Sequence, residues 1–117
     1  MSEAALFIGW NRPVVGRETQ AANFWKESLN FYTTLQKEGT IESYEPVLLT
    51  ANGGTMNGFF LLRGNQNKLD ALQHDERYLD FTIKANVLLE NFSAVPAWVD
   101  KGLEKVIARY TMLAAKI

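Results

Sequence analysis

The chain has 117 residues, 47% of them hydrophobic, which indicates one folded domain, residues 1–117, and excludes a disordered chain. It holds no cysteine, so disulfides, thiolate zinc sites and cysteine nucleophiles are excluded. Its 12 basic and 13 acidic residues form no basic stripe, so we expect no nucleic acid as a partner. Its apolar runs are shorter than the roughly 20 residues that span a bilayer, so we expect no membrane partner either.

The N-terminal segment MSEAALFIGW has no positively charged region before its apolar part, so it does not resemble a signal peptide, and we expect a cytoplasmic protein. The stretch ALFIGWN (5–11) is apolar, aromatic and β-branched, which predicts a first strand. A helix is expected next, from about residue 17 to 38, with Gly39 suited to its C-terminus. Two sets of residues repeat there at helical spacing: Phe24, Ser28, Phe31 and Leu35, and Ala21, Trp25, Leu29 and Tyr32.

The middle of the chain predicts a hairpin. TIESYEPVLLTA (40–51) and MNGFFLLRG (56–64) read as strands, and NGGT between them suits a tight turn because Asn and Gly accept positive φ at little cost. Three glycines within residues 52–58 could suggest a phosphate-binding loop. No helix follows them, however, so a turn explains the segment.

Residues 65–92 alternate at helical period and predict a short helix, a joint near His74 and a longer helix. The segment SAVPAWV (93–99) predicts a fourth strand, and Asp100 is suited to cap a final helix. The expected buried stripe of the middle helices is Leu69, Leu72, Leu79, Ile83 and Val87. The final helix carries Leu103, Val106, Ile107, Tyr110 and Leu113 on one face.

This order is β-α-β-β-α-β with one C-terminal helix, which predicts an α+β, ferredoxin-like antiparallel sheet. In that topology the second and fourth strands lie at the edges of the sheet. These strands contain Pro46 and Pro96, which cannot donate a ladder hydrogen bond and are tolerated at edges.

The first and third strands are apolar on both faces. Phe7 alternates with Leu6 and Ile8, and Phe60 alternates with Phe59 and Leu61. A sheet with one wet face should alternate apolar and polar residues instead. We therefore expect a homodimer that covers the sheet face left bare by the helices.

In this layout, from ALFIGWN through FWKESLNFYTTLQKEG to GFFLLRGNQNKLDALQHDERYLDF, the chain resembles the dimeric α+β barrel superfamily over nearly its whole length. That superfamily includes antibiotic-biosynthesis-type and haem-degrading monooxygenases, muconolactone isomerase-like proteins and stress-responsive barrel proteins. The resemblance implies a dimeric barrel of two sheets, and it leaves the activity open because one fold hosts many chemistries.

His74 is the chain's one histidine and is followed by Asp75 and Glu76. It could act as a general base, since imidazole titrates near neutral pH, or be a polar residue at a helix joint that Asp75 caps. The resemblance adds a third reading, a haem ligand, with Asn11 placed like an Asn of haem-degrading members. Those members also use a Trp where this chain has Phe59 and Phe60, which argues against haem, and we expect no cofactor. Adjacent helical residues do not share a face, so we expect no metal site either.

The end of the first strand is the expected ligand-binding site. In this topology it lies near the start of the third strand, which brings aromatic and polar groups together as small-molecule pockets require. The expected ligand-binding residues are Trp10, Asn11, Arg12, Trp25 and Asn57, with Arg17 and Glu18 nearby and Phe24 and Phe31 as further walls. The alternative is a solvated polar rim around a core Trp10.

Three functions stay open. The first is a small-molecule-binding homodimer, including a cofactor-independent enzyme for an aromatic or polyketide-like ligand, in which His74 would transfer a proton. The second is a haem-binding or haem-degrading monooxygenase-like protein. The third is a dimerisation module without chemistry.

Overall fold

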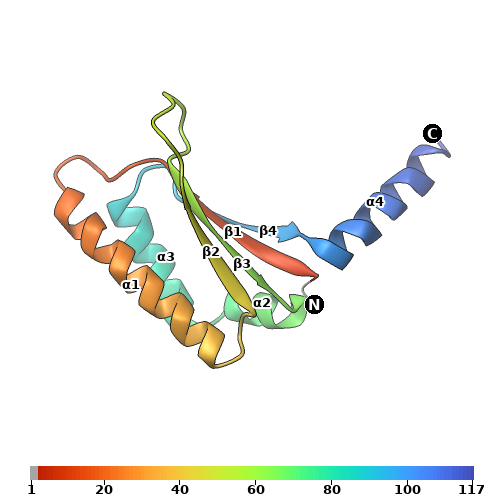
Figure 1. The fold of residues 1–117 in the computed structure, drawn as a ribbon, viewed down its shortest axis with the longest axis horizontal. Helices are drawn as coiled ribbons and strands as arrows, with labels where there is room; N and C mark the ends of the chain where they lie inside the picture. The colour runs from red at the N-terminus through yellow and green to blue at the C-terminus, as the bar shows by residue number, and fades with distance from the viewer. Residues whose placement is uncertain (1–2) are drawn as a thin grey trace.

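The computed structural model describes residues 3–117, which form an α+β fold (Figure 1). The expected order of elements is confirmed. The strands are β1 (Ala4–Trp10), β2 (Ser43–Leu48), β3 (Gly58–Gly64) and β4 (Ser93–Trp98), and the helices are α1 (Glu18–Lys37), α2 (Gln66–Leu72), α3 (Glu76–Leu88) and α4 (Asp100–Ala114).

The four strands form one open antiparallel sheet in the order β2-β3-β1-β4. Pro46 and Pro96 therefore lie on the two edge strands, as predicted, where their missing N–H groups do not interrupt the central ladder. The centre of the sheet is the β1–β3 pair, whose register runs from Ala4 opposite Gly64 to Trp10 opposite Gly58.

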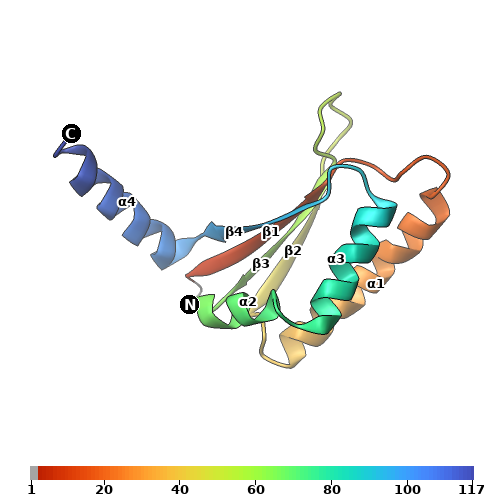
Figure 2. The ribbon, with the colours of Figure 1, turned by 180° about the vertical axis from the view of Figure 1, so that it is seen from behind.

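Helices α1, α2 and α3 cover one face of this sheet (Figure 2). The residues of β1 and β3 that point toward them are buried: Leu6 and Ile8 are 1% exposed, Phe60 is 3% exposed and Leu62 is 0% exposed. Tyr32 of α1 packs on this layer with its ring centroid 4.7 Å from that of Phe60. We call this side the covered face.

The opposite side of the sheet carries no helix, and we call it the open face. Its residues alternate with the buried ones, as the sequence predicts. Phe7 lies opposite Leu61 and packs diagonally on Phe59 of the same strand with ring centroids 5.0 Å apart, and both phenylalanine side chains stay half-buried. Leu61 is half-buried as well, and Val95 on the edge strand β4 is 50% exposed.

The predicted buried stripe of α3 is wrong. Leu69 and Leu72 of α2 are buried, but Leu79, Ile83 and Val87 of α3 are 54%, 54% and 53% exposed. The side of α3 that faces α1 and the sheet carries Tyr78, Phe81, Ala85 and Leu88 instead. Both sets of residues obey helical spacing. The aromatic side is buried because Phe81 lies between Phe24 and Phe31 of α1, with ring centroids 5.0 and 5.2 Å away.

The hairpin is looser than predicted, because β2 and β3 are shorter than residues 40–51 and 56–64 and a loop of residues 49–57 joins them. The side chain of Asn52 organises this loop. Its oxygen accepts a hydrogen bond from the Gly54 N–H (2.7 Å), and its amide donates to the carbonyl of Met56 (3.2 Å). Gly53 takes the positive φ of 74° that the turn needs.

The start of α4 also differs from the prediction. Val99, not Asp100, occupies the N-cap position, and no side chain within residues 3–117 makes the cap bond. Asp100 itself has a φ of 50°, a left-handed conformation that turns the chain away from β4. Helix α4 then extends away from the rest of the molecule (Figure 1).

Candidate functional site

A cavity of about 210 Å³ lies between the covered face of the sheet and helix α1, where β1 ends. The sheet contributes Ile8, Trp10 and Phe60, and α3 with the residue after it contributes Phe81 and Leu89. The remaining lining residues are Pro13, Glu18, Ala21, Ala22, Phe24, Trp25, Ser28, Tyr32 and Leu48. The space is therefore apolar, as binding sites for small molecules mostly are.

Three aromatic rings form one wall of the cavity. The ring centroid of Phe60 lies 5.0 Å from that of Trp25 and 5.5 Å from that of Trp10, and the two indoles meet edge to face at 6.0 Å. Gly58 makes room for this wall, since a Cβ there would lie 2.7 Å from the indole of Trp10. Two of the predicted ligand-binding residues, Trp10 and Trp25, thus line one cavity.

The polar groups of the lining are few. The Ser28 hydroxyl donates to the carbonyl of Phe24 one turn earlier (2.8 Å), and the Glu18 carboxylate accepts from the Gly16 N–H at 3.0 Å. The hydroxyl of Tyr32 is different, because it is buried without a hydrogen-bond partner among residues 3–117. A buried unpaired hydroxyl costs about 1–3 kcal/mol, so it needs an explanation.

Burial raises the pKa of Tyr32 well above its ordinary value of 10.0, and the neighbouring Tyr78 raises it further. The Tyr32 phenol is therefore neutral near pH 7, where it can donate and accept hydrogen bonds but cannot act as a phenolate base.

Asn11 and Asn57 meet at the rim of the sheet, but they bond to protein rather than line the cavity. The Asn57 amide donates to the side-chain oxygen of Asn11 (2.8 Å), and the Asn11 amide donates to that of Asn91 (3.3 Å). The backbone N–H of Asn57 donates to the carbonyl of Trp10 (2.8 Å). Asn11 is 6% exposed, so this asparagine cluster (Asn11, Asn57, Asn91) ties together three segments where the sheet ends.

Arg12 faces solvent and pairs with Glu90, with 3.2 Å between the guanidinium Nε and the carboxylate oxygen. Its side chain is 68% exposed, so the pair is of the weak surface type. Arg17 precedes α1 at the N-cap position and does not line the cavity. Of the polar residues predicted at the site, Glu18 lines the cavity with the two tryptophans, whereas Asn11, Arg12 and Asn57 do not.

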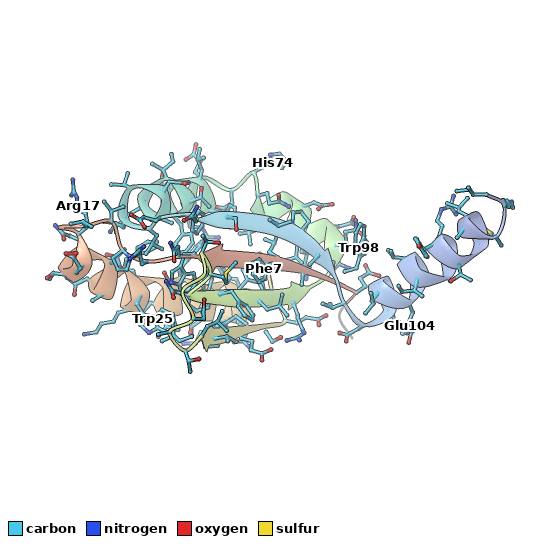
Figure 3. The ribbon with its side chains drawn as sticks, turned by 90° about the horizontal axis from the view of Figure 1, so that it is seen from above. Phe7, Arg17, Trp25, His74, Trp98 and Glu104 are labelled. Atoms are coloured by element: carbon cyan, nitrogen blue, oxygen red, sulfur yellow. The ribbon has the colours of Figure 1, made fainter. Side chains whose placement is uncertain are left out.

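His74 is exposed in the joint between α2 and α3 (Figure 3). It is not among the residues that line the cavity. Helix α3, about 20 Å long, separates it from Leu89 at the cavity. Asp75 caps α3 as predicted, since its side chain accepts from the Arg77 N–H at 2.8 Å. The Arg77 guanidinium donates hydrogen bonds to both Glu38 and Asp75 and thereby connects the joint to the end of α1. The same hydrogen bonds lower the pKa of both carboxyl groups.

Within residues 3–117, no three His, Asp or Glu side chains converge as metal ligands would. Nor does any helix of this range combine the length and the apolar character of a membrane span.

Ten lining residues escaped the sequence reasoning as named site residues, among them Ser28, Tyr32 and Phe60. One signal was present in the helical pattern. Ser28 is a small polar residue in the stripe that also carries Phe24 and Phe31, and a small side chain on a buried face leaves space beside it.

No protein-family model and no curated protein matches this sequence. Its fold is similar to the crystal structure of a dimeric protein of unknown function and ferredoxin-like fold from Bacteroides fragilis, with a TM-score of 0.60 and 13% sequence identity. The match covers 85% of this chain and 98% of that one. The predicted ferredoxin-like α+β fold is confirmed by this likeness and by the order of the strands.

Proposed function

We propose that the chain forms a homodimer through its open face and binds a small, flat, largely apolar molecule in the cavity of each protomer. The observation that carries the binding function is the apolar cavity of about 210 Å³ walled by Trp10, Trp25 and Phe60. Binding sites for small molecules are mostly apolar spaces of this kind with a few polar groups.

The volume limits the size of the ligand. An apolar cavity of about 150 Å³ can hold benzene, and pockets for drug-sized molecules measure roughly 300–1,000 Å³. At about 210 Å³ the cavity suits one aromatic ring with short substituents, such as a phenol or a quinone. A polycyclic polyketide would need the cavity to widen.

The placement of His74 favours binding over proton-transfer chemistry. The residue is exposed and lies at the far end of α3 from the cavity, so it would not reach a ligand held there. The lining offers the neutral Tyr32 and the Glu18 carboxylate, whose two oxygens already accept from the Gly16 N–H.

Two observations support dimerisation. The centre of the open face is apolar, and the similar protein from Bacteroides fragilis is described as dimeric. Two sheets packed face to face would place Phe7, Phe59 and Leu61 in a shared core, as sheet-on-sheet packing does. Together the two open sheets would form the barrel of the superfamily that the sequence resembles.

Tryptophan fluorescence tests the ligand site. In a Trp98→Phe background both remaining tryptophans, Trp10 and Trp25, line the cavity, so a bound phenol or quinone should change the emission. Ser28→Leu should fill the space and weaken binding at least about 10-fold, because the leucine would occupy the volume of the ligand. The matched control is Asn30→Leu, on the exposed side of the same helix. Equal binding by both variants would place the site elsewhere.

A further inference from the structure

The apolar side of α4 is exposed to solvent. Four side chains that fall on one face of this helix, Leu103, Ile107, Tyr110 and Leu113, are 48%, 55%, 70% and 47% exposed. We call this set the arm face. An isolated helix of about 15 residues is only marginally stable in water, and its stability in proteins comes from packing an amphipathic face. The arm face therefore needs a partner surface.

The base of α4 is fixed to the sheet. Gly102 is buried, and a Cβ at this position would clash with the backbone carbonyl of Glu3 just before β1. The N–H groups of Gly102 and Leu103 both donate to the carbonyl of Val99, at 3.0 and 3.2 Å. The direction of the helix is thus set by close backbone packing at its first turn.

That direction leads away from the helices of the same chain. Helices α1 and α3 lie on the covered face, whereas α4 projects from the end of β4 on the other side of the sheet (Figures 1 and 3). Helix α4 begins two residues after β4, the strand that contributes Val95 and Ala97 to the open face. A second chain seated on the open face would therefore meet α4 as well.

The area of the interface points the same way. The open face is four strands wide, at about 4.8 Å per strand, and seven residues long, at about 3.3 Å per residue, so its outline covers roughly 440 Å². A stable interface buries about 800 Å² on each partner. The arm face, about 22 Å long and about 10 Å wide, adds roughly 220 Å². Each protomer would both give an arm and receive one, which brings its buried area to about 880 Å².

We propose that α4 is a clasping arm whose apolar face packs against the edge of the sheet in a second copy of this chain, while the partner's arm packs in return. This inference rests on the proposed dimer through the open face. A lipid surface is the rival occupant. The arm face carries neither Trp nor Phe, which membrane-surface helices favour, and Asp100 and Glu104 offset part of the positive charge of α4.

Sedimentation equilibrium of four variants tests the arm. Leu103→Glu/Ile107→Glu places two charges on the arm face, and Ala108→Glu/Met112→Glu places two on the opposite, exposed side of α4. Because the dimer would lose four apolar contacts, the first pair should raise its dissociation constant about 100-fold, and the second should change it less than about 3-fold. Val95→Glu on the open face and the unaltered chain complete the set.

Each outcome decides between the two proposals. If Val95→Glu dissociates the dimer and both α4 variants behave alike, the arm is refuted and the open-face dimer stands. If the unaltered chain is a monomer, both proposals fail. A third outcome is that Leu103→Glu/Ile107→Glu leaves the dissociation constant of the dimer unchanged but abolishes binding to anionic phosphatidylserine vesicles, which the unaltered chain binds. The occupant of the arm face is then a lipid surface, and the arm is refuted.

Cross-linking gives a second readout that does not depend on how the charged variants fold. The chain has no cysteine, so Tyr110→Cys carries a single site for a maleimide-benzophenone reagent. We expect a product of twice 13.2 kDa, joined to β2 or β4 of the other chain. Products formed only within one chain would overturn the proposal.

Discussion

The two faces of the sheet are both apolar at their centre, but their surroundings differ, and within residues 3–117 only the open face carries charge, at Arg63 and Glu45. On the covered face Leu62 is 0% exposed beneath α1 and α3, and one residue earlier Leu61 of the open face is only half-buried. The apolar pattern of a strand therefore does not predict which of its two faces is covered by helices of the same chain. The difference teaches that the covered face is completed within one protomer, whereas the apolar centre of the open face is the surface that the proposed dimer would bury.

The largest effect should come from truncating the covered face. Leu62→Ala is expected to lower the free energy of unfolding by about 3 kcal/mol, because it removes buried methyl groups and leaves a cavity. Leu61→Ala should instead act mainly on association, so its effect on unfolding in urea should depend on protein concentration. Equal, concentration-independent losses from both variants would erase the contrast between the faces.

The next largest effect on the free energy of unfolding should come from the asparagine cluster, where the sheet ends. Asn11→Ala is expected to lower the free energy of unfolding by about 1–2 kcal/mol, since it leaves the side chains of Asn57 and Asn91 without their partner. The same variant should leave phenol binding within about 2-fold, because Asn11 does not line the cavity. A selective loss of binding would restore Asn11 as a ligand contact.

Tyr32→Phe tests the buried hydroxyl of α1 that has no hydrogen-bond partner among residues 3–117. Without a ligand it should raise the free energy of unfolding by about 1 kcal/mol, because the buried hydroxyl has no partner. Because burial raises the pKa of Tyr32 in the folded state, ionisation of this residue does not affect stability below pH 10. As the pH rises further, it lowers the free energy of unfolding. Chemical denaturation from pH 8 to 11 should therefore show a smaller alkaline loss in the variant, and a destabilised variant would contradict this.

His74→Ala should have the smallest effect, because this side chain belongs to neither face. An exposed substitution at a helix joint should change the free energy of unfolding by less than about 0.5 kcal/mol. Fluorescence titration with a phenol should give the same affinity as in the unaltered chain. A large loss of affinity would return His74 to the site.

Local patterns in the sequence predicted the order of elements and the edge strands, because apolar periodicity and proline act through their immediate neighbours. They failed for α3, whose two apolar stripes both fit a helix. Only the packing of Phe81 against Phe24 and Phe31 decides which one is buried. They also gave Asp100 a capping role that the left-handed backbone at this residue does not allow.

The candidate site was predictable in part for a related reason. Trp10 and Trp25 could be placed from strand and helix spacing, and both line the cavity. The amides of Asn11 and Asn57 are instead taken up by partners 80 and 46 residues apart in the chain, which no local pattern reveals.

The most direct test of this account is the mass of the chain in solution, measured by sedimentation equilibrium for two matched variants. Val95 of the open face and Leu79 on the outer side of α3 are 50% and 54% exposed in a single protomer. The account predicts a dimer of twice 13.2 kDa for the unaltered chain and for Leu79→Glu, and a monomer for Val95→Glu. A dimer that survives Val95→Glu but is lost in Leu79→Glu would contradict it and move the interface to α3.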